Sequence, residues 1–389
     1  MVAAFGDAGH AFPAIALGRA LAERGHEVVV ETWERWREAV EDLGLQFTAA
    51  EQYTVFPPPK AGSGDATAAE AARALAPFLE DWRPDALVSD ILTVAPPLAA
   101  ETVGVRRATL VPHPYPAQED GMPFFATGAR MARTPIGRML WRAGTPLLHI
   151  GLRKGREELN EQRAQLGLAP VERFHGGISE DLAMVATFPQ LEYPRRWPPQ
   201  VQVTGPMEFE LPYPDVELPA GDAPLVLVAP STAKDPECRL VRTALEGLAD
   251  QRVRVVATTN RAQPERSIEV SDNAVLVDWL SYTQVMPRAA LVICHGGHGT
   301  TVRALGAGVP VLCCPVAGDM SENGVRVAWA GAGLSLPWRL CRPAPLRWAA
   351  RRILGDPGFR QRAGELAEWR RENDGARIGA ELVEKFASG

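Results

Sequence analysis

Short apolar runs alternate with amphipathic stretches of helical length through the first half of the chain. The pattern predicts a helix over 13–24 that ends at Gly25. It predicts strands over four apolar runs, at 2–5, 26–31, 86–89 and 108–111. Strands that alternate with helices in this way are typical of a parallel sheet with helices on both faces. We therefore expect a doubly wound α/β domain over 1–206.

The same alternation restarts after a segment rich in proline and acidic residues, and we interpret 207–222 as a linker. The second unit has predicted strands at 225–229, 253–258, 274–277, 290–294 and 309–313, and predicted helices at 238–248, 300–307 and 322–330. This is a second Rossmann-like domain over 223–370. The helical residues 371–389 are expected to pack back on the first domain. Two such domains place a cleft between the carboxyl ends of two sheets, where ligands bind.

Composition narrows the class of protein. The 389 residues suit two domains, and 46% apolar with 23% charged residues is ordinary for a soluble protein. A net charge of −6 argues against nucleic acid as a partner, because phosphate backbones select basic surfaces. We see no signal peptide and no apolar run of about 18 residues, so we expect a cytoplasmic protein. Five cysteines without C-x-x-C spacing predict buried free thiols: Cys238, Cys294, Cys313, Cys314 and Cys341.

Three segments are candidates for binding a substrate. Residues 53–68 are rich in proline and glycine and predict a loop. Residues 112–133, with prolines, glycines and aromatic side chains, are expected to wall a pocket over the sheet. Residues 134–152 are both apolar and basic. We interpret them as a helix of the acceptor pocket, with contact to a membrane surface as the less favoured alternative.

The most informative motif is H-G-G-H-G-T at 295–300, which follows a predicted strand and opens a predicted helix. Glycines let the backbone approach a ligand closely, and the start of a helix offers free N–H groups to an anion. His295, Thr300 and Thr301 add further donors. A diphosphate fits such a site, whereas the alternative is a glycine-rich turn that serves packing alone.

Residues 277–323 resemble the donor-binding signature of GT-B glycosyltransferases, which include bacterial macrolide and antibiotic glycosyltransferases and UDP-sugar transferases. The family pattern is W-x-P-Q, H-G-G-x-G-T, E-A-L-x-x-G-V-P and P-x-x-x-D-Q-x-x-N-A. Its parts stand here, in order and spacing, at 279–282, 295–300, 303–310 and 315–324. The resemblance implies two Rossmann-like domains that face a cleft. Family members usually carry a few more residues before the first strand, so the natural chain is expected to begin upstream.

The resemblance implies a role for each matching residue. Trp279 would lie against the nucleobase, with the backbone near Leu280 and Ser281 at the edge of the base. Four residues would hold the diphosphate: His295, Gly297, Gly299 and Thr300. Asp319 would accept hydrogen bonds from sugar hydroxyls. Asn323 would contact a phosphate or pack the loop, and Ser231 would contact a phosphate or cap a helix.

The chain departs from the family pattern at three places. Met320 replaces a glutamine that contacts the donor sugar, so a deoxysugar would leave fewer polar groups unpaired. Arg303 replaces a glutamate that binds ribose hydroxyls, a contact that a dTDP-sugar needs less. Ser281 and Tyr282 replace the proline and glutamine of W-x-P-Q, which leaves the choice between UDP and dTDP open.

The segment G-D-A-G-H-A-F-P at 6–13 resembles the family's G-x-x-G-H-x-x-P. His10 would lie in a loop at the carboxyl end of the sheet. There it would take a proton from the acceptor hydroxyl, because its pKa lies near neutrality. Asp90 matches the carboxylate that orients this histidine, with a helix cap as the alternative. His113, between prolines, contacts substrate or has a structural role.

The resemblance implies a metal-independent enzyme that inverts the anomeric centre, since the chain has no DxD-type motif. Its partners would be a nucleotide diphosphate sugar and a small apolar acceptor, with no cofactor beyond that co-substrate. Three alternatives stay open: a lipid or sterol glycosyltransferase at a membrane, a dinucleotide-dependent oxidoreductase, and a non-catalytic sugar-nucleotide-binding subunit. The oxidoreductase is the weakest, because G-D-A-G-H-A lacks the G-x-G-x-x-G spacing. The sequence carries no signal for the oligomeric state.

Overall fold

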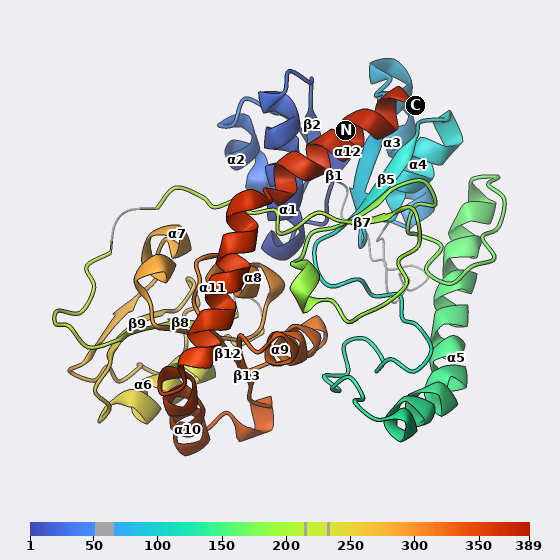
Figure 1. The fold of residues 1–389 in the computed structure, drawn as a ribbon. Helices are drawn as coiled ribbons and strands as arrows, with labels where there is room; N and C mark the ends of the chain where they lie inside the picture. The colour runs from blue at the N-terminus through green and yellow to red at the C-terminus, as the bar shows by residue number, and fades with distance from the viewer. Residues whose placement is uncertain (51–65, 214–215, 232–233) are drawn as a thin grey trace.

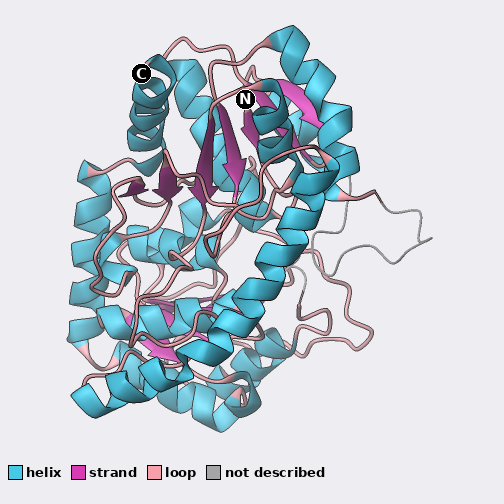
Figure 2. Cartoon of the chain, turned by 90° about the vertical axis from the view of Figure 1, so that its right-hand side faces the viewer, coloured by secondary structure: helices cyan, strands magenta, loops and turns pink. Residues whose placement is uncertain are grey.

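A computed structural model describes residues 1–50, 66–213, 216–231 and 234–389 of the chain. Two parallel sheets lie in separate halves of the molecule, each covered by helices (Figures 1 and 2). The cysteines are all buried and free. Most of the loop predicted at 53–68 lies outside the described residues.

The N-terminal sheet has seven strands in the order β3-β2-β1-β4-β5-β6-β7, and every pairing is parallel. The strands are β1 Val2–Ala3, β2 Val29–Thr32, β3 Gln46–Ala49, β4 Leu87–Asp90, β5 Arg107–Val111, β6 Ala183–Val185 and β7 Val201–Val203. The apolar runs predicted four of them, β1, β2, β4 and β5. They did not predict β3, which is partly exposed, or β6 and β7, which have three residues each.

The helices of this domain are α1 Ala8–Glu23, α2 Arg37–Glu41, α3 Ala68–Trp82, α4 Ala95–Val103 and α5 Pro135–Gln165. The sequence prediction was wrong about the start of α1, which begins five residues before Pro13. Asp7 is the N-cap, and its carbonyl accepts the backbone N–H groups of His10 and Ala11. His10 therefore lies in the first turn of a helix and not in the preceding loop.

The C-terminal sheet has six parallel strands in the order β10-β9-β8-β11-β12-β13. They are β8 Leu225–Ala229, β9 Arg254–Thr258, β10 Ala274–Val277, β11 Leu291–Cys294, β12 Val311–Cys313 and β13 Gly333–Ser335. Six helices surround them: α6 Arg239–Leu248, α7 Tyr282–Val285, α8 His298–Gly306, α9 Asp319–Ala330, α10 Pro343–Leu354 and α11 Pro357–Glu372. The two motif helices, α8 and α9, begin two and three residues earlier than predicted.

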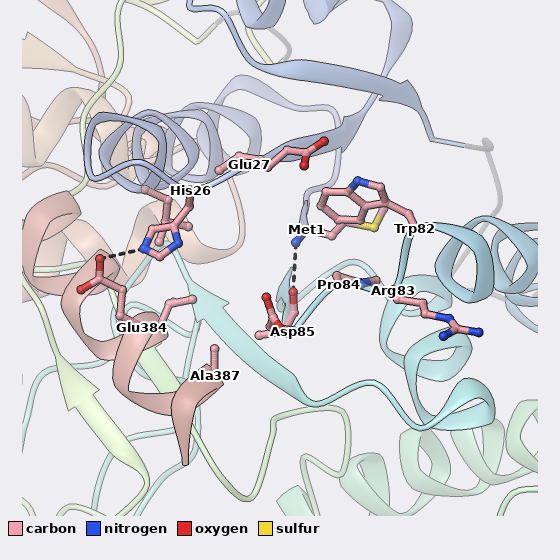
Figure 3. Close-up of a pocket in the computed structure, with 13 residues that line it drawn as sticks. Met1, His26, Glu27, Trp82, Arg83, Pro84, Asp85, Glu384 and Ala387 are labelled. Atoms are coloured by element: carbon pink, nitrogen blue, oxygen red, sulfur yellow. Dashed lines mark hydrogen bonds and ion pairs between the residues drawn. The ribbon is translucent and has the colours of Figure 1, made fainter.

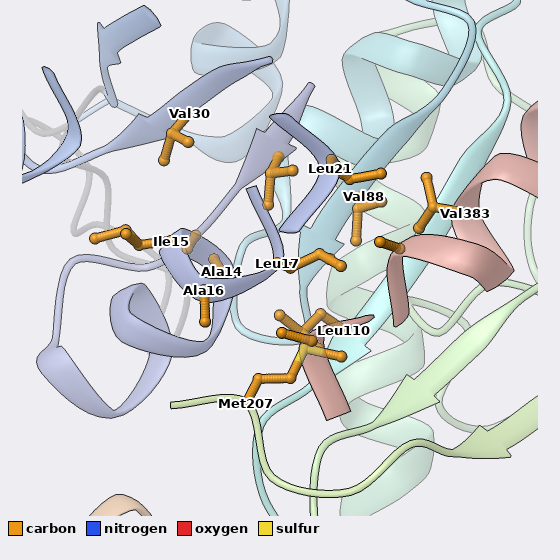
Figure 4. Close-up of a cluster of buried hydrophobic side chains, with 14 of the residues drawn as sticks. Ala14, Ile15, Ala16, Leu17, Leu21, Val30, Val88, Leu110, Met207 and Val383 are labelled. Atoms are coloured by element: carbon orange, nitrogen blue, oxygen red, sulfur yellow. The ribbon is translucent and has the colours of Figure 1, made fainter. Parts of the chain in front are cut away.

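The last helix, α12 Gly375–Ser388, leaves the C-terminal half and packs along α1 (Figure 1). Val383 of α12 joins Leu17 of α1, Leu110 of β5 and Met207 of the linker in one buried cluster (Figure 4). Apolar burial of this kind is the main favourable contribution to folding. The helix is thus part of the N-terminal core.

Glu384 adds polar contacts to the same junction. Its carboxylate takes two hydrogen bonds from Arg24, both 2.7 Å. It also lies 2.8 Å from His26 (Figure 3). A cavity of 210 Å³ opens beside these residues. It lies at the amino ends of β1 and β4, whereas ligands of parallel sheets bind at the carboxyl ends. We therefore look for the functional site elsewhere.

The long helix α5 includes the apolar and basic segment 134–152 and stands on the outer side of the N-terminal domain (Figures 1 and 2). Trp141 and Gly144 pack on Phe124 of the preceding loop. Its other face carries exposed apolar side chains: Ile136, Met139, Leu140, Leu147 and Ile150. Within the described part of the chain, no helix is both long and apolar enough to span a bilayer.

Gly375, at the start of α12, allows a test of how this last helix packs on the N-terminal domain. A Cβ atom there would collide with the backbone carbonyls of Gly205 and Pro206, whereas a Cβ on Gly364 of α11 meets no atom within 4 Å. We expect Gly375→Ala to lower the free energy of unfolding by about 1–3 kcal/mol. Gly364→Ala should raise it by about 0.5–1 kcal/mol, because alanine is the better helix residue. Urea denaturation measures both, and equal effects would contradict the proposed contact.

Candidate active site

The carboxyl ends of β1 and β4 bring His10 and Asp90 together. Nδ1 of His10 lies 2.7 Å from Oδ1 of Asp90. The other oxygen of Asp90 accepts the backbone N–H of Phe5 and the hydroxyl of Thr93, both at 3.3 Å. Asp90 is 1% exposed, so its position is fixed by these donors. Because the carboxylate accepts at Nδ1, that nitrogen carries the proton and Nε2 keeps a lone pair.

The turn before His10 is held in place by residues that follow the neighbouring strand, β2. The indole of Trp36 donates to the carbonyl of Gly6 at 2.8 Å, and Arg35 donates to the same oxygen. A side chain on Gly6 would collide with the ring of Trp33. The glycine of this motif is therefore required by close packing of an aromatic ring.

Two opposing effects set the pKa of His10. Burial lowers it, but the charge of Asp90 and the hydrogen bond to it raise it, with smaller contributions from Asp319 and Asp7. The net pKa lies above the ordinary value of 6.5. A base with a pKa in this region can hold a proton during a reaction near neutral pH.

His113 follows β5 and lies beside this pair. Its ring centroid is 6.2 Å from that of His10 and 5.6 Å from that of Phe125. Its Nδ1 lies 2.8 Å from the carbonyl oxygen of Pro114, which fixes the proton on Nδ1. Burial, followed by repulsion from His10, lowers the pKa of His113 despite that hydrogen bond. The ring is therefore neutral.

The predicted diphosphate loop joins β11 to α8. Gly296 has φ +84°, and a Cβ there would lie 2.8 Å from the carbonyl oxygen of Met320. A Cβ on Gly297 would collide with the ring of His295, while one on Gly299 would point into open space. Thr300 lies half-buried in the first turn of α8. The backbone N–H groups of this turn point out of the helix start, where they favour an anion.

His295 and Ser231 follow the neighbouring strands β11 and β8. Nδ1 of His295 is 3.5 Å from the carbonyl of Ala229, and burial lowers the pKa of His295. The hydroxyl of Ser231, 4% exposed, accepts the backbone N–H of Lys234 at 3.0 Å. The alternative interpretation of Ser231 as a helix cap was wrong, because the next helix, α6, begins at Arg239 with Cys238 as its N-cap.

Asn323 holds the loop from α9. Its amide donates to the carbonyl of Gly296 at 2.9 Å, and its Oδ1 lies 3.2 Å from Nδ1 of His298. His298, which sequence reasoning did not select, reaches across the domains, with Nε2 3.2 Å from the carbonyl of Ala186. Burial lowers the pKa of His298 to about 4. Asn323 is 2% exposed, so its side chain packs the loop.

Asp319 and Met320 begin α9. Asp319 is exposed, and its charge contributes an upward shift to the pKa of four histidines from both domains: His10, His113, His295 and His298. For the last three, burial has the larger effect and lowers the pKa. An exposed charge acts only over a short distance, because it is screened within about 10 Å, so the predicted sugar-binding acid lies near the predicted base of the other domain.

A buried ionic network joins the two domains. Arg326 of α9 contacts Glu322 at 2.7 Å and Glu192 of the N-terminal domain at 3.0 Å. Glu322 also accepts the backbone N–H of Ala126, and Glu192 accepts that of Tyr115 at 2.6 Å. The loop 112–133 is thereby attached to the helix that carries Asp319. Local sequence gave no signal for the two contacts between the domains, because Arg326 and Glu192 are 134 positions apart and Glu322 and Ala126 are 196 apart.

The nucleoside end contains residues that the motif did not include. The ring of Trp279, half-buried, lies 5.1 Å from the ring of Tyr213 in the linker and 5.0 Å from the guanidinium of Arg261. The side chain of Leu280 is in the core at 2% exposure, so only its backbone can meet a ligand. A base stacked on Trp279 would adjoin Tyr213 and Arg261.

Arg303 forms an ion pair where the family pattern has an acid. Its guanidinium contacts Glu210 of the linker at 3.0 Å and donates to the carbonyl of Phe209 at 2.8 Å. Glu210 also accepts the backbone N–H groups of Tyr282 and Thr283 at the start of α7, and the hydroxyl of Ser281. A groove of 650 Å³ lies between the linker, α7 and α8 at this pair.

Among the described residues, no group of three histidine, cysteine, aspartate or glutamate side chains is arranged to hold a metal ion.

Comparison with known proteins agrees with this architecture. Residues 242–386 match the family model described as Erythromycin biosynthesis protein CIII-like, C-terminal domain. The O-mycaminosyltylonolide 6-deoxyallosyltransferase of Streptomyces fradiae is 29% identical, over 98% of this chain and 96% of that protein.

Solved structures match the whole chain. The glycosyltransferase of kitacinnamycin aligns with a TM-score of 0.79 and 19% identity, over 99% of this chain and 98% of that chain. The glycosyltransferase VinC in complex with dTDP aligns with a TM-score of 0.71 and 20% identity, over 100% of this chain and 98% of that chain. The chain is a glycosyltransferase of the GT-B fold, similar to those of antibiotic biosynthesis.

The pKa of His10 provides a test of the His10–Asp90 pair. Burial is the largest single effect on the pKa of His10, and the contributions that together outweigh it come first from Asp90. Asp90→Asn removes that negative charge, so we expect the pKa of His10 to fall. Turnover that needs neutral His10 rises as pH rises through this pKa, so its acidic limb should move to lower pH. NMR titration of the ring measures the shift. Asp319→Asn is the matched control and should lower the pKa less, whereas an equal or larger effect would contradict the pairing.

Proposed function

We propose that this glycosyltransferase transfers a sugar from a dTDP-sugar to a hydroxyl of a small, largely apolar natural-product acceptor, with inversion at the anomeric carbon. One observation carries the proposal. The domain that holds the His10–Asp90 pair meets the start of α8 in the other domain, where Nε2 of His298 lies 3.2 Å from the carbonyl oxygen of Ala186.

The geometry supports a single displacement. The acceptor hydroxyl gives its proton to Nε2 of His10 while its oxygen attacks the anomeric carbon. The bond from that carbon to the diphosphate breaks, and the diphosphate leaves with the electron pair. Asp90, bonded at Nδ1, stabilises the imidazolium that forms. One displacement inverts the configuration at the anomeric carbon.

The leaving diphosphate would bind at the helix start. Backbone N–H groups of residues 297–300 and the positive end of the α8 dipole stabilise negative charge. Gly299 leaves room for the ligand to approach this backbone, because a Cβ atom there would meet no atom within 4 Å. We propose that these groups serve the role that a metal ion has in other transferases, and that no cofactor beyond the nucleotide sugar is needed.

The Arg303–Glu210 pair supports a deoxyribose nucleotide. Glu210 already accepts hydrogen bonds from two backbone N–H groups, a hydroxyl and a guanidinium. It therefore has little capacity left for a ribose 2′-hydroxyl, which would be buried without a good acceptor. The dTDP complex of a similar structure is consistent with this choice.

Met320 supports a donor sugar with few hydroxyls. Its thioether side chain cannot pair with sugar hydroxyls, which leaves Asp319 as the polar group of this turn. A relative that matches the whole chain is a 6-deoxyallosyltransferase, which agrees with a deoxysugar donor.

The acceptor side is apolar and aromatic. The loop 112–133 brings Phe125 against His113, and Phe124 against Trp141 of α5. This arrangement supports the interpretation of α5 as a wall of the acceptor pocket. The exposed apolar face of α5 favours a second candidate, a lipid or sterol glycosyltransferase at a membrane surface. Flotation with liposomes separates the two.

His10→Ala tests the catalytic step. We expect turnover of a hydroxyl acceptor with a dTDP-sugar to fall by about 10²–10⁴-fold, the usual contribution of general base catalysis. The affinity for dTDP, measured by calorimetry, should stay unchanged because His10 lies in the other domain. His26→Ala, at the exposed contact with Glu384, is the control and should retain turnover. Full activity of His10→Ala would remove His10 from the mechanism.

Four nucleotides test the donor assignment: dTDP, dUDP, UDP and ribothymidine diphosphate. Together they separate the effect of the 2′-hydroxyl on affinity from the effect of the 5-methyl group. We expect the 2′-hydroxyl to weaken binding about tenfold on either base, because Glu210 is already saturated. Calorimetry or thermal shift measures the affinities. Equal affinities for UDP and dUDP would overturn the role given to Arg303 and Glu210.

A further inference from the structure

We infer that His113 binds a hydroxyl group of the acceptor through Nε2, beside the base that removes the proton. The inference deepens the proposed function and rests on it. It assigns a substrate contact to a side chain that the motifs left open between binding and structure.

The position of the ring is the first support. His113 follows the carboxyl end of β5 in the N-terminal domain, and its ring centroid lies 6.2 Å from that of His10 and 5.6 Å from that of Phe125. An acceptor whose hydroxyl reaches His10 therefore comes within reach of His113. Polar atoms that line such an apolar pocket usually orient the ligand.

The hydrogen bonds of the ring are the second support. Nδ1 donates to the carbonyl of the next residue, Pro114, at 2.8 Å. A neutral imidazole with its proton on Nδ1 has a bare lone pair on Nε2. Within the described parts of the chain, Nε2 of His113 has no hydrogen-bond partner. The atom is also not fully buried. It is therefore open to a donor such as a hydroxyl.

His113 is not a second base, because its surroundings differ from those of His10. His10 pairs with a buried carboxylate, whereas His113 bonds to a neutral carbonyl. Burial and repulsion from His10 favour the neutral form of His113. A neutral ring also avoids a second positive charge beside the imidazolium that His10 becomes. His113 can thus accept a hydrogen bond without competing for the proton.

A structural role makes a different prediction from this binding role. The bond from Nδ1 joins neighbours in sequence, so it stabilises a local turn. An asparagine can place its amide nitrogen where Nδ1 lies and keep the bond to Pro114, but it has no atom at Nε2. A glutamine can place its amide oxygen near Nε2. Two conservative variants therefore separate the two roles.

The experiment compares His113→Asn and His113→Gln with the natural chain. The donor is dTDP-rhamnose, a dTDP-6-deoxyhexose that fits the proposed deoxysugar, and the acceptor is whichever of a panel of phenols and macrolactone alcohols the natural chain glycosylates best. We expect His113→Asn to raise the KM for the acceptor about tenfold, the usual effect of losing one hydrogen bond in a cleft. His113→Gln should recover most of that loss, and the affinity for dTDP should not change in either variant.

Three results would overturn the inference. Full activity of His113→Asn with loss in His113→Gln would indicate that only the turn matters. Weaker dTDP-rhamnose binding in both variants would place His113 on the donor. Unchanged KM in both variants would remove it from the site. Failure of the natural chain to transfer sugar to any acceptor would instead count against the proposed function itself.

Discussion

The buried carboxylate of Asp90 is the constraint on which the site depends. A carboxylate with 1% exposure must be compensated by donors, and here a backbone N–H, a hydroxyl and the ring of His10 supply them. The same contacts orient His10, fix its tautomer and raise its pKa. Burial alone would have lowered that pKa. The fold therefore supplies a base by placing β1 and β4 side by side.

The second constraint is the way the domains are held across the cleft. Arg326, Glu322 and Glu192 are buried, and desolvation makes such groups costly unless every charge is paired. Removing one partner would leave an uncompensated charge. The network ties the loop beside His113 to the helix of Asp319, so the acceptor wall and the sugar-binding turn are positioned together. Their relative placement is a property of both domains.

At the nucleoside end, a residue that departs from the family motif is compensated by an opposite charge elsewhere in the chain. Arg303 reverses a charge within the motif, and Glu210 of the linker, 93 positions away, supplies the opposite charge. That carboxylate also satisfies the free N–H groups at the start of α7. Tyr213, from the same linker, lies against Trp279. The linker is therefore part of the donor site as well as a connection.

The sequence by itself determined the two alternating domains and the glycine loop before α8, because these depend on local periodicity and motif spacing. The pairing of His10 with Asp90, 80 positions away, was implied by the resemblance to a family. It placed four strands of the first sheet and five of the second, but not the short strands such as β6. Only the tertiary structure decided that His10 begins a helix, that Asn323 packs the loop, and that His298, Glu192 and Glu210 join distant segments. Those contacts depend on burial and charge pairing between residues far apart in the chain, which no local pattern records.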